Sequence, residues 1–524
     1  MVVAQRGMVA ASNPLAAQAG LDILRKGGNA ADAAIATAAV LNVTAPASTG
    51  IGGDCFALYF DAQTKQITAL NGSGRAPAGL TLSDLHKMGF PDMPEHSPYA
   101  VTVPGAVRGW EDLLKRHGTM TLAEVLVDAI HYAGEGFPVS PVFGASWVRA
   151  EVLLVGSPNT EEYLPGGKAP KVGQVVRLPG LARSFQQIAE GGADAFYMGE
   201  IAAAIVATLN DLGGKMSLDD LKNHQSTWDE PIHTDYRGVR VYECPPNGQG
   251  LAALQALNIA KGWKLADMAD RSPQRLHLMV EAMRLAFADA RQYIADPATD
   301  PVPVKALLSD EYAAERRAMV SEEHAMQPPE FGAPLPGSDT VYLSVVDGAG
   351  NACSFINSLY MGFGSGIVAK GTGVFLQNRG ANFSLDPTHP NAYAPGKRPY
   401  HTIIPGMATR DGELWASFGV MGGFMQPQGH FQVISSMVDD DLNPQEALDR
   451  PRFCLLAGTS SSIVALEEGI PVHTMARLAE LGHPIQPMAA GNHAAFGSGQ
   501  IIRRDAGVLY GGSDPRKDGL VAAF

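Results

Sequence analysis

The 524-residue chain changes its sequence pattern abruptly at Thr340. Upstream, from residue 105 to 325, apolar residues recur mainly at the spacing of amphipathic helices. Downstream, short segments rich in β-branched and aromatic residues predict strands, beginning with Thr340–Asp347. Between the two, Gln327–Asp339 is rich in proline and glycine and predicts an exposed linker. Any fold for this chain therefore has to combine a helix-rich part with a strand-rich part.

The first 70 residues predict two helices followed by two strands. Asn13–Lys26 has apolar residues at helical spacing, and a glycine pair follows it. The alanine-rich stretch from Asn29 predicts a helix close against a sheet, because its side chains are small. Strands are expected at Cys55–Phe60 and Gln66–Leu70. The other predicted elements are helices at Ala106–His117, Leu122–Gly134, Pro179–Glu190 and Ser272–Tyr293, and strands at Asn351–Ser358, Ile403–Ala408, Glu413–Val420, Gln500–Arg504 and Val508–Tyr510.

The charge balance and the cysteines argue against several classes of protein. The chain has 39 basic and 53 acidic residues and no marked basic patch, which argues against a nucleic-acid partner. The amino terminus shows no signal peptide, and the apolar run Ala30–Val43 is too short to span a bilayer. We therefore expect a cytoplasmic protein without a nucleic-acid or membrane partner. Four widely spaced cysteines predict buried free thiols: Cys55, Cys244, Cys353 and Cys454.

A hydroxyl residue opens the first strand after the linker, in the sequence Gly337-Ser338-Asp339-Thr340. A threonine hydroxyl in this position can attack the carbonyl of the preceding peptide bond, move the acyl group to oxygen, and let water release it. The product has a free α-amine, with a pKa of about 8, beside the hydroxyl that the amine can deprotonate. Taken alone, the same four residues fit a capping cluster at the start of a strand, which is the more common arrangement.

Ten segments spread along nearly the whole chain share one set of motifs: GGNAADAAIA (27–36), PASTGIGGDCF (46–56), VPGAVRGW (103–110), GEGFPVS (134–140), ECPPNGQG (243–250), DTVYLSVVDGAGNACS (339–354), FGSGI (363–367), APGKRP (394–399), GVMGG (419–423) and GSDPR (512–516). Together they resemble the γ-glutamyltranspeptidase family. Each segment alone is weak, but ten in the family's order are not a chance match. The resemblance implies an α/β fold, the αββα four-layer sandwich of the N-terminal nucleophile hydrolases.

The resemblance also implies that the chain cleaves itself between Asp339 and Thr340. Residues 1–339 would then form a large, helix-rich subunit and residues 340–524 a small, strand-rich one. The two share one sandwich as a heterodimer, and further dimerisation stays open.

The family's catalytic residues map onto four positions of this sequence. Thr340 is the nucleophile. Ser358 stands where the family has a second threonine that hydrogen-bonds the nucleophile. Gly422 and Gly423 match the pair whose N–H groups form the oxyanion hole, although a plain turn would use the same glycines.

The chain departs from the family where a γ-glutamyl substrate is held. The family's arginine for the substrate α-carboxylate is replaced by Ser73, and Arg75 could substitute only indirectly if this segment is a strand. The family's acid for the α-ammonium group is replaced by Asn382. At the remaining ligand positions stand Tyr360, Arg379, His401 and Thr402.

These changes share a direction, because an anionic ligand is lost and a cation, Arg379, is gained. Arginine binds carboxylates through two parallel hydrogen bonds. The sequence therefore predicts hydrolysis of a small carboxylate-bearing amide such as oxamate, and it resembles the oxamate amidohydrolase type. Three alternatives remain: a γ-glutamyl hydrolase or transpeptidase, an acylase for glutaryl-type amides, and a processed but inactive binding protein. Arg379 could instead pair with a structural acid.

We predict no metal and no cofactor. His389, His401 and His430 match no known metal-site spacing, and histidines satisfied by the protein itself are more common. The glycine-rich motifs that bind nucleotides, GxGxxG after a strand and GxxxxGK[ST], do not occur. The expected ligand is a small-molecule amide.

Overall fold

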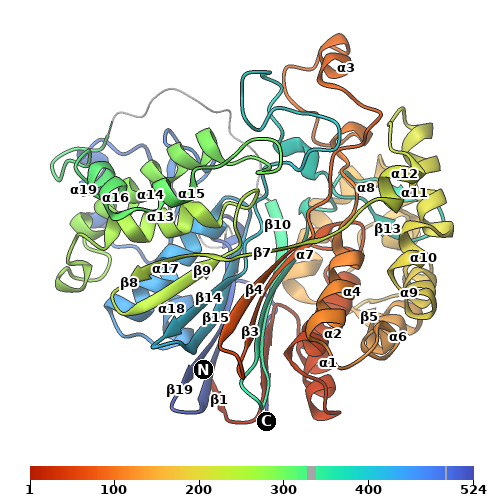
Figure 1. Cartoon of the computed structure of the whole chain (residues 1–524), viewed down its shortest axis with the longest axis horizontal. Coiled ribbons are helices and arrows are strands. Elements are labelled where there is room, and N and C mark those ends of the chain that lie inside the picture. Colours follow the sequence, from red (N-terminus) through yellow and green to blue (C-terminus); the bar gives the residue numbers. More distant parts are fainter. Residues whose placement is uncertain (327–337, 490–492) are drawn as a thin grey trace.

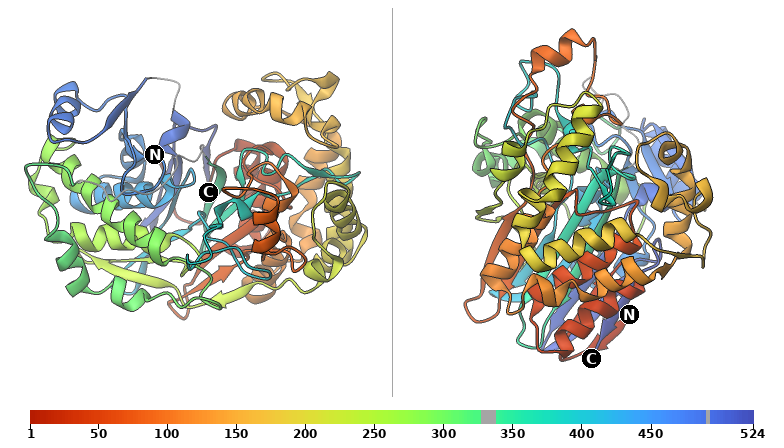
Figure 2. Two further views of the ribbon diagram at one scale, coloured as in Figure 1. Left: turned by 90° about the horizontal axis from the view of Figure 1, so that it is seen from above. Right: turned by 90° about the vertical axis from the view of Figure 1, so that its right-hand side faces the viewer.

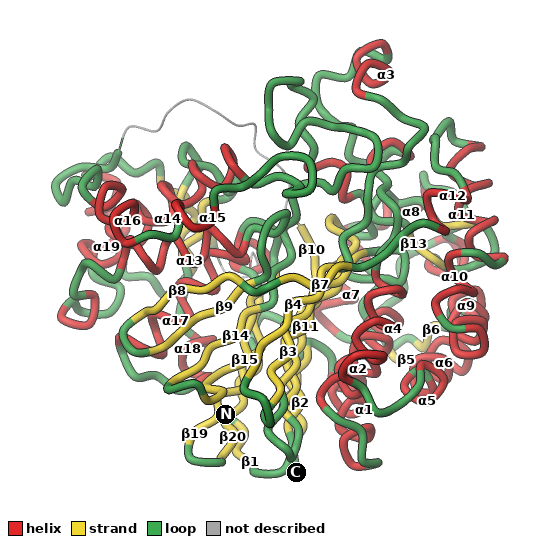
Figure 3. The backbone as a smooth tube through the Cα atoms, in the orientation of Figure 1, coloured by secondary structure: helices red, strands yellow, loops and turns green. Residues whose placement is uncertain are grey.

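The computed structural model describes residues 1–326, 338–489 and 493–524. Two seven-stranded sheets lie face to face in the middle of the molecule, and helices cover the outer face of each (Figures 1 and 3). Seen from above, the two helical layers lie on opposite sides of the strands (Figure 2). This is the four-layer αββα sandwich, so the predicted fold class is confirmed.

Neighbouring strands are antiparallel throughout both large sheets. Sheet I has the order β21 (Leu520–Ala523), β2 (Met8–Ala11), β10 (Ser338–Val346), β11 (Ala352–Met361), β3 (Asp54–Asp61), β4 (Gln66–Asn71) and β7 (Thr227–Asp229). Sheet II has the order β1 (Val2–Ala4), β20 (Val508–Ser513), β19 (Ser498–Asp505), β15 (Glu413–Met421), β14 (Gly406–Arg410), β9 (Val239–Glu243) and β8 (Ile232–Tyr236). An apolar core fills the space between them.

Each sheet has its own helical layer. On sheet I lie α1 (Pro14–Arg25), α2 (Ala30–Thr44), α4 (Ala106–His117), α5 (Leu122–Val125), α6 (Val127–Glu135), α7 (Pro141–Arg149), α8 (Glu151–Val155), α9 (Pro179–Gly191), α10 (Ala193–Tyr197), α11 (Glu200–Asp211) and α12 (Leu218–Lys222). On sheet II lie α13 (Gly250–Ala260), α14 (Pro273–Tyr293), α15 (Val304–Leu307), α16 (Asp310–Arg317), α17 (Met425–Asp439), α18 (Pro444–Asp449) and α19 (Val472–Glu480). Helix α3 (Leu82–Lys87) projects at the top of Figure 1.

Short elements complete the fold. Three small sheets pair β5 (Phe137–Pro138) with β6 (Val175–Val176), β12 (Val368–Ala369) with β13 (Val374–Phe375), and β17 (Val464–Glu467) with both β16 (Phe453–Leu455) and β18 (Ile485–Met488). The 3₁₀ turns are η1 (Pro98–Ala100), η2 (Glu161–Tyr163), η3 (Pro165–Gly167), η4 (Leu265–Asp267), η5 (Arg379–Asn382) and η6 (His493–Phe496).

Helix α2 illustrates how local sequence positions an element against the site. Its N-cap, Asn29, accepts hydrogen bonds from the N–H groups of Ala31 and Asp32, and the Asp32 carboxylate accepts one from the Asn29 N–H in return. All fifteen residues of α2 are buried. Its small side chains let the helix pack against β10 and β11, as predicted.

Most predicted elements are confirmed, with ends shifted by a few residues. Residues 105–325 are mainly helical, as predicted, but the sequence analysis missed three short strands there: β7 belongs to sheet I, and β8 and β9 belong to sheet II. Ser338 and Asp339, predicted as linker, begin β10 instead. The rest of the predicted linker lies outside the described residues. All four cysteines are buried free thiols, as predicted.

No single helix in the described ranges is long and apolar enough to cross a membrane. Helix α9 together with the segment 193–211, bent by 120°, meets that test on length and composition alone. Phe185, Ile188 and Phe196 of this pair are fully buried in the core beside sheet I.

Candidate active site

Three polar side chains lie on neighbouring strands of sheet I: Thr340 on β10, Ser358 on β11 and Asp54 on β3. Asp54 is directly opposite Ser358 in the β3–β11 ladder, and Thr340 lies at a register shift in the β10–β11 ladder. Side chains alternate between the faces of a strand. The residues two positions further into each strand belong to the core between the sheets: Tyr342, Ile356 and Phe56. The three polar side chains therefore form a buried row facing sheet II.

Thr340 and Ser358 are in direct contact. Their hydroxyl oxygens lie 3.2 Å apart, and both side chains are fully buried. The Ser358 hydroxyl also accepts a hydrogen bond of 2.8 Å from the Tyr360 N–H. Strand β10 runs unbroken through Asp339 and Thr340, so this is the geometry before any cleavage. The predicted pair of hydroxyl residues is thus assembled in the uncut chain.

The glycine pair lies at the same end of the stacked sheets. Across the interface, the Ser344 hydroxyl donates to the Ser417 hydroxyl over 2.6 Å, and a Cβ on Gly419 would come within 2.5 Å of the Tyr342 ring. Continuing two residues along each strand brings Thr340 opposite the end of β15, where Gly422 and Gly423 follow.

The two glycines form the turn between β15 and α17. Gly422 and Gly423 have φ angles of +122° and +61°, a region that favours glycine. The Gln249 side chain donates to the Gly423 carbonyl over 2.8 Å and holds the turn. Backbone N–H groups at such a helix start can stabilise an oxyanion.

Arg379 lies in η5 and contacts the Ser358 side chain. It is fully buried, and its two Nη atoms donate to the hydroxyls of Thr402, over 2.6 Å, and Ser358, over 3.1 Å. Its guanidinium lies 4.6 Å from the centre of the Tyr360 ring, a cation–π contact. Burial lowers the pKa of Arg379 to about 10, against the opposing effect of Asp54. Arg379 therefore stays charged near neutral pH.

Among the described residues, Arg379 forms no ion pair. Over the described ranges, no carboxylate oxygen lies within 4.0 Å of its guanidinium, and its Nε has no hydrogen-bond partner. A direct salt bridge to a structural acid is therefore absent among the described residues, although the nearby Asp54 carboxylate opposes the lowering of the Arg379 pKa. The direct partners of Arg379 are neutral hydroxyls, so its guanidinium can still bind the carboxylate of a ligand.

Asp54 completes the row, and the sequence analysis assigned it no role. One carboxylate oxygen accepts hydrogen bonds from the N–H of Gly74 at 3.1 Å, the N–H of Gly105 at 3.0 Å, and the side chain of Gln377 at 2.8 Å. A Cβ on Gly74 would lie 1.5 Å from the Val103 carbonyl oxygen, so only glycine fits there. Asp54 and Gly105 each lie in a family-like segment, so two of these segments meet at this carboxylate.

His401 binds the second oxygen of Asp54, with its Nε2 3.0 Å away. The opposite ring nitrogen, Nδ1, accepts from the Ile403 N–H at 3.3 Å, which places the His401 proton on Nε2. Burial and the nearby charge of Arg379 lower the pKa of His401 well below its usual value. The histidine is therefore a neutral donor to Asp54.

Tyr360 and Asn382 complete the surroundings of Arg379. Tyr360 has a φ of +83°, unusual for a bulky residue, and directs its ring under the guanidinium. Burial raises the pKa of its hydroxyl to about 12, although Arg379 opposes this. Tyr360 and Thr402 contact Arg379, His401 lies near enough to respond to its charge, and Asn382 lies beside the Tyr360 hydroxyl. None of these four side chains carries a negative charge.

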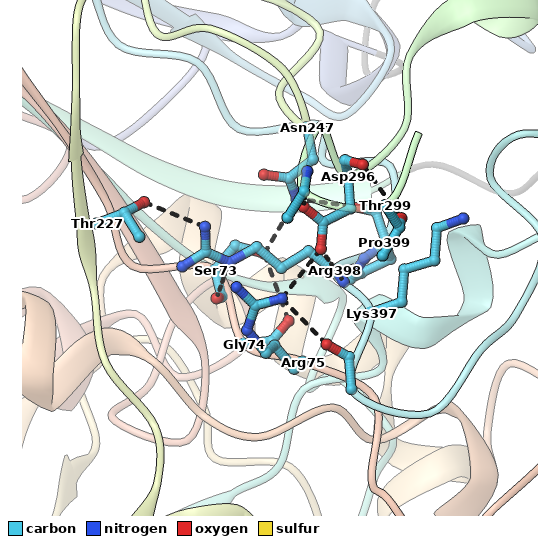
Figure 4. A network of polar contacts seen from close by, with 12 residues as sticks. Ser73, Gly74, Arg75, Thr227, Asn247, Asp296, Thr299, Lys397, Arg398 and Pro399 are labelled. Carbon is cyan, nitrogen blue, oxygen red and sulfur yellow. Dashed lines mark hydrogen bonds and ion pairs between the residues drawn. The ribbon is translucent and has the colours of Figure 1, made fainter. Parts of the chain in front are cut away.

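Ser73 and Arg75 belong to an adjoining network (Figure 4). Arg75 binds the Asp296 carboxylate at 3.0 Å, so its charge is already paired. The Ser73 hydroxyl accepts from the Asn247 side chain at 3.1 Å, and its carbonyl accepts from Arg398. Strand β4 ends at Asn71, so the strand assumed in the argument about Arg75 is absent from this segment. A substrate-binding role for either residue stays a prediction.

The two other histidines considered as metal ligands in the sequence analysis both have protein partners. His389 contacts the Arg291 carbonyl at 3.0 Å, and His430 lies 2.6 Å from Glu243. Elsewhere in the described chain, potential ligand atoms of His277, Glu281 and His483 lie within 4.8 Å of one another. A guanidinium, that of Arg284, lies 3.4 Å from Glu281 and supplies the positive charge that a metal would bring, so we assign no metal.

The fold and the site define an N-terminal nucleophile amidohydrolase, in which a hydroxyl residue at the start of a sheet strand faces a glycine turn. A family model described as Gamma-glutamyltranspeptidase matches residues 16–524. The chain belongs to the gamma-glutamyltranspeptidase family.

Three relatives show the range of activities in this part of the family. A glutathione hydrolase-like YwrD proenzyme of Bacillus subtilis is 39% identical over 100% of this chain and 99% of its own length. An oxamate amidohydrolase proenzyme of Klebsiella pneumoniae is 37% identical, over 100% of this chain and 99% of its own. The crystal structure of a cephalosporin acylase from Bacillus halodurans is 48% identical, with a TM-score of 0.94, and covers 100% of this chain and 96% of that chain.

Proposed function

We propose that this chain cleaves itself between Asp339 and Thr340 and then hydrolyses a small amide that bears a carboxylate, with oxamate as the first candidate. The observation that supports this most concerns Arg379. It is a buried cation that forms no ion pair with the residues the structure describes, and it donates to the hydroxyl touching Thr340. A substrate carboxylate at Arg379 would place its amide carbonyl beside the nucleophile.

The chemistry needs only groups already assembled. After cleavage, the free α-amine of Thr340, with an ordinary pKa of about 8, takes the proton of its own hydroxyl. The hydroxyl oxygen attacks the amide carbonyl, and the N–H groups of Gly422 and Gly423 stabilise the oxyanion. The tetrahedral intermediate expels the amine with the transferred proton and leaves an acyl ester on Thr340. Water then hydrolyses the ester and releases the acid.

A γ-glutamyl substrate fits the charges of this site less well. Its α-ammonium group needs an anionic partner, and Tyr360, Asn382 and Thr402 offer none. The Asp54 carboxylate already accepts four hydrogen bonds. A glutaryl-type amide, which has a carboxylate and no ammonium group, remains the second candidate. The similarity to a cephalosporin acylase supports keeping it.

A comparison of matched substrates tests the proposal. Oxamate and oxamide differ only in that a neutral amide replaces the carboxylate, and a γ-glutamyl anilide and a glutaryl anilide cover the alternatives. We expect kcat/KM for oxamate or for the glutaryl anilide to exceed that for the γ-glutamyl anilide. A clear preference for the γ-glutamyl anilide would overturn the proposed substrate class.

Arg379→Met tests the carboxylate contact itself, because methionine keeps an unbranched side chain of similar reach without charge. We expect kcat/KM for the carboxylate-bearing substrate to fall by about 100-fold, the loss of a charge-assisted pair of roughly 3 kcal/mol, with a far smaller change for oxamide. A denaturing gel confirms that the variant still cleaves itself. An equal loss of kcat/KM for charged and neutral amides would show that Arg379 does not bind the substrate carboxylate.

A further inference from the structure

The family-like segment ECPPNGQG (243–250) ends beside the site, and the proposed reaction uses none of its side chains. Its backbone pairs with that of His401. The Gln249 N–H donates to the His401 carbonyl over 3.0 Å, and the His401 N–H donates to the Asn247 carbonyl over 2.9 Å. These bonds hold Gln249 at the start of α13, and its side chain is fully buried. The Gln249 side chain therefore begins at a fixed point next to the site.

The carboxamide of Gln249 joins two loops. Its nitrogen donates to the Thr402 carbonyl over 2.7 Å and to the Gly423 carbonyl over 2.8 Å. Its oxygen accepts from the Tyr400 hydroxyl over 3.1 Å, which fixes the orientation of the amide plane. A primary amide has two N–H donors, so both are occupied. Gln249 is therefore a buried cross-link between the loop that contains Thr402 and the turn formed by Gly422 and Gly423.

Each of the two loops positions one group that the proposed substrate needs. The Thr402 hydroxyl accepts from Arg379 over 2.6 Å, so its loop helps to position the cation for the substrate carboxylate. Gly423 belongs to the glycine pair that would bind the amide oxygen. A chain of direct hydrogen bonds thus connects Arg379 through Thr402 and Gln249 to the glycine turn.

We propose that Gln249 is a positioning residue that fixes the separation between Arg379 and the glycine turn, and thereby selects the acyl-chain length of ω-carboxy amides. The inference rests on the proposed function, because it needs a carboxylate at Arg379 and an amide oxygen at the turn. In such a substrate only the acyl chain joins these two groups. It has no methylene group in oxamate, and it gains one methylene group at each step through malonamate, succinamate and glutaramate. Gln249 acts through the two loops, since both of its donors are occupied.

A fixed spacing has a large effect on rate. Each added methylene group lengthens an extended acyl chain by about 1.3 Å, because carbon–carbon bonds are about 1.5 Å long. A misplacement of about 1 Å at the reacting centre can lower the rate on the order of 100-fold. All four amides carry the same carboxylate and share the contact with Arg379, so KM should differ among them less than kcat does.

The first experiment measures kcat and KM of the wild-type enzyme for oxamate, malonamate, succinamate and glutaramate. We expect kcat for one of them to exceed kcat for its neighbours in the series by roughly 10- to 100-fold. Similar kcat values for all four amides would overturn the inference and leave the proposed function standing. If none of the four is turned over, the proposed function fails, and the inference fails with it.

Gln249→Met removes the cross-link, because methionine has a similar unbranched reach but cannot donate to either carbonyl. The Gln426 side chain still accepts from the Ile404 N–H over 2.9 Å, which keeps this loop attached to the start of α17. We expect kcat for the preferred amide to fall by roughly tenfold and the preference over its neighbours to shrink to about threefold or less. This ratio does not depend on the fraction of active enzyme. An unchanged ratio would overturn the inference.

Gln432→Met is the control for general loosening of the fold. Gln432 is a buried glutamine further along α17, and its amide donates to the carbonyls of Gln428 and Phe453 over 3.0 and 3.1 Å. It also accepts from the Phe453 N–H over 3.1 Å. The variant should lose stability as Gln249→Met does but keep the wild-type preference for chain length. An equal loss of preference in both variants would contradict the positioning role of Gln249.

Tyr400→Phe keeps the inference testable if Gln249→Met fails to fold or to cleave itself. It removes the hydroxyl that orients the Gln249 amide but keeps both N–H donors and the aromatic ring that Arg291 contacts. We expect the preference for one chain length to shrink in the same direction, by a smaller factor. A wild-type preference in Tyr400→Phe would overturn the inference.

Discussion

The Ser358 hydroxyl lies between Arg379 and the nucleophile Thr340 and contacts both. It lies 3.2 Å from the Thr340 hydroxyl and accepts from Arg379 at 3.1 Å. Removing it leaves a buried Arg379 donor unsatisfied and Thr340 without its neighbour, which costs about 1–3 kcal/mol. We expect Ser358→Ala to lower both the rate of self-cleavage and kcat by roughly 10- to 100-fold. Time courses on denaturing gels and steady-state assays measure the two rates.

Ser358→Thr is the control for that prediction. It keeps the hydroxyl and adds one methyl group, at a position where the family has threonine. We expect both rates to return to within a few-fold of wild type. Wild-type rates in Ser358→Ala would show that this hydroxyl does not assist Thr340.

At the level of residues, the sequence predicted which side chains form the site, but not the hydrogen bonds that hold the Asp54 carboxylate there. Thr340, Ser358 and Arg379 could be placed because each stands in or beside a family-like segment. Asp54 stands inside the segment PASTGIGGDCF, yet its role depends on donors from residues 74, 105, 377 and 401. Contacts over such sequence separations are set by the stacked sheets and leave no local pattern. The acid directly after Gly52-Gly53 was the available signal.

At the level of elements, the turn between β10 and β11 supports a helix of the other part of the chain. Asp347 in this turn accepts from the Ala30 N–H, at the start of α2, over 3.0 Å. It also accepts from Ala349 and from the backbone and side chain of Asn351. One buried carboxylate therefore fixes both the hairpin that presents Thr340 and the first turn of α2.

We expect Asp347→Ala to reduce the free energy of unfolding by about 1–3 kcal/mol, because it removes a helix cap and leaves buried N–H groups unsatisfied. KM should not change, since Asp347 lies at the far end of β10 from Thr340. Asp61→Ala is the control, because Asp61 accepts similar turn hydrogen bonds from Gln63 and Thr64 at an exposed hairpin. Urea unfolding midpoints measure both, and equal shifts would contradict the role given to Asp347.

Elements were predictable where their signals are local. The caps of α1 and α2, Asn13 and Asn29, stand next to the helices that they start. Strands β7, β8 and β9 have at most five residues each, too few to show a period, and only pairing across the sheets defines them. The predicted helix Leu122–Gly134 breaks into α5 and α6 at Leu126, which serves as the end of one and the start of the next.

At the scale of the whole molecule, residues 1–339 and 340–524 are interleaved in both large sheets. In sheet I, β2 lies between β21 and β10, and β3 pairs with β11. In sheet II, β1 pairs with β20, and β9 pairs with β14. Five strand ladders therefore cross the division at Thr340, and separating the two parts would expose unpaired backbone along all of them.

We therefore expect cleavage to divide the chain into two fragments that stay together as one folded protein. The mature protein should run as two bands on a denaturing gel and elute as one species on a sizing column, at the position of uncut Thr340→Ala, or at one common multiple of it if the protein dimerises. Thr340→Ala, which lacks the hydroxyl that attacks the Asp339–Thr340 bond, should give one band of full length. The two fragments should separate only in denaturant. Two bands from Thr340→Ala would show that another group cuts the chain, and fragments that separate in native buffer would contradict the shared sheets.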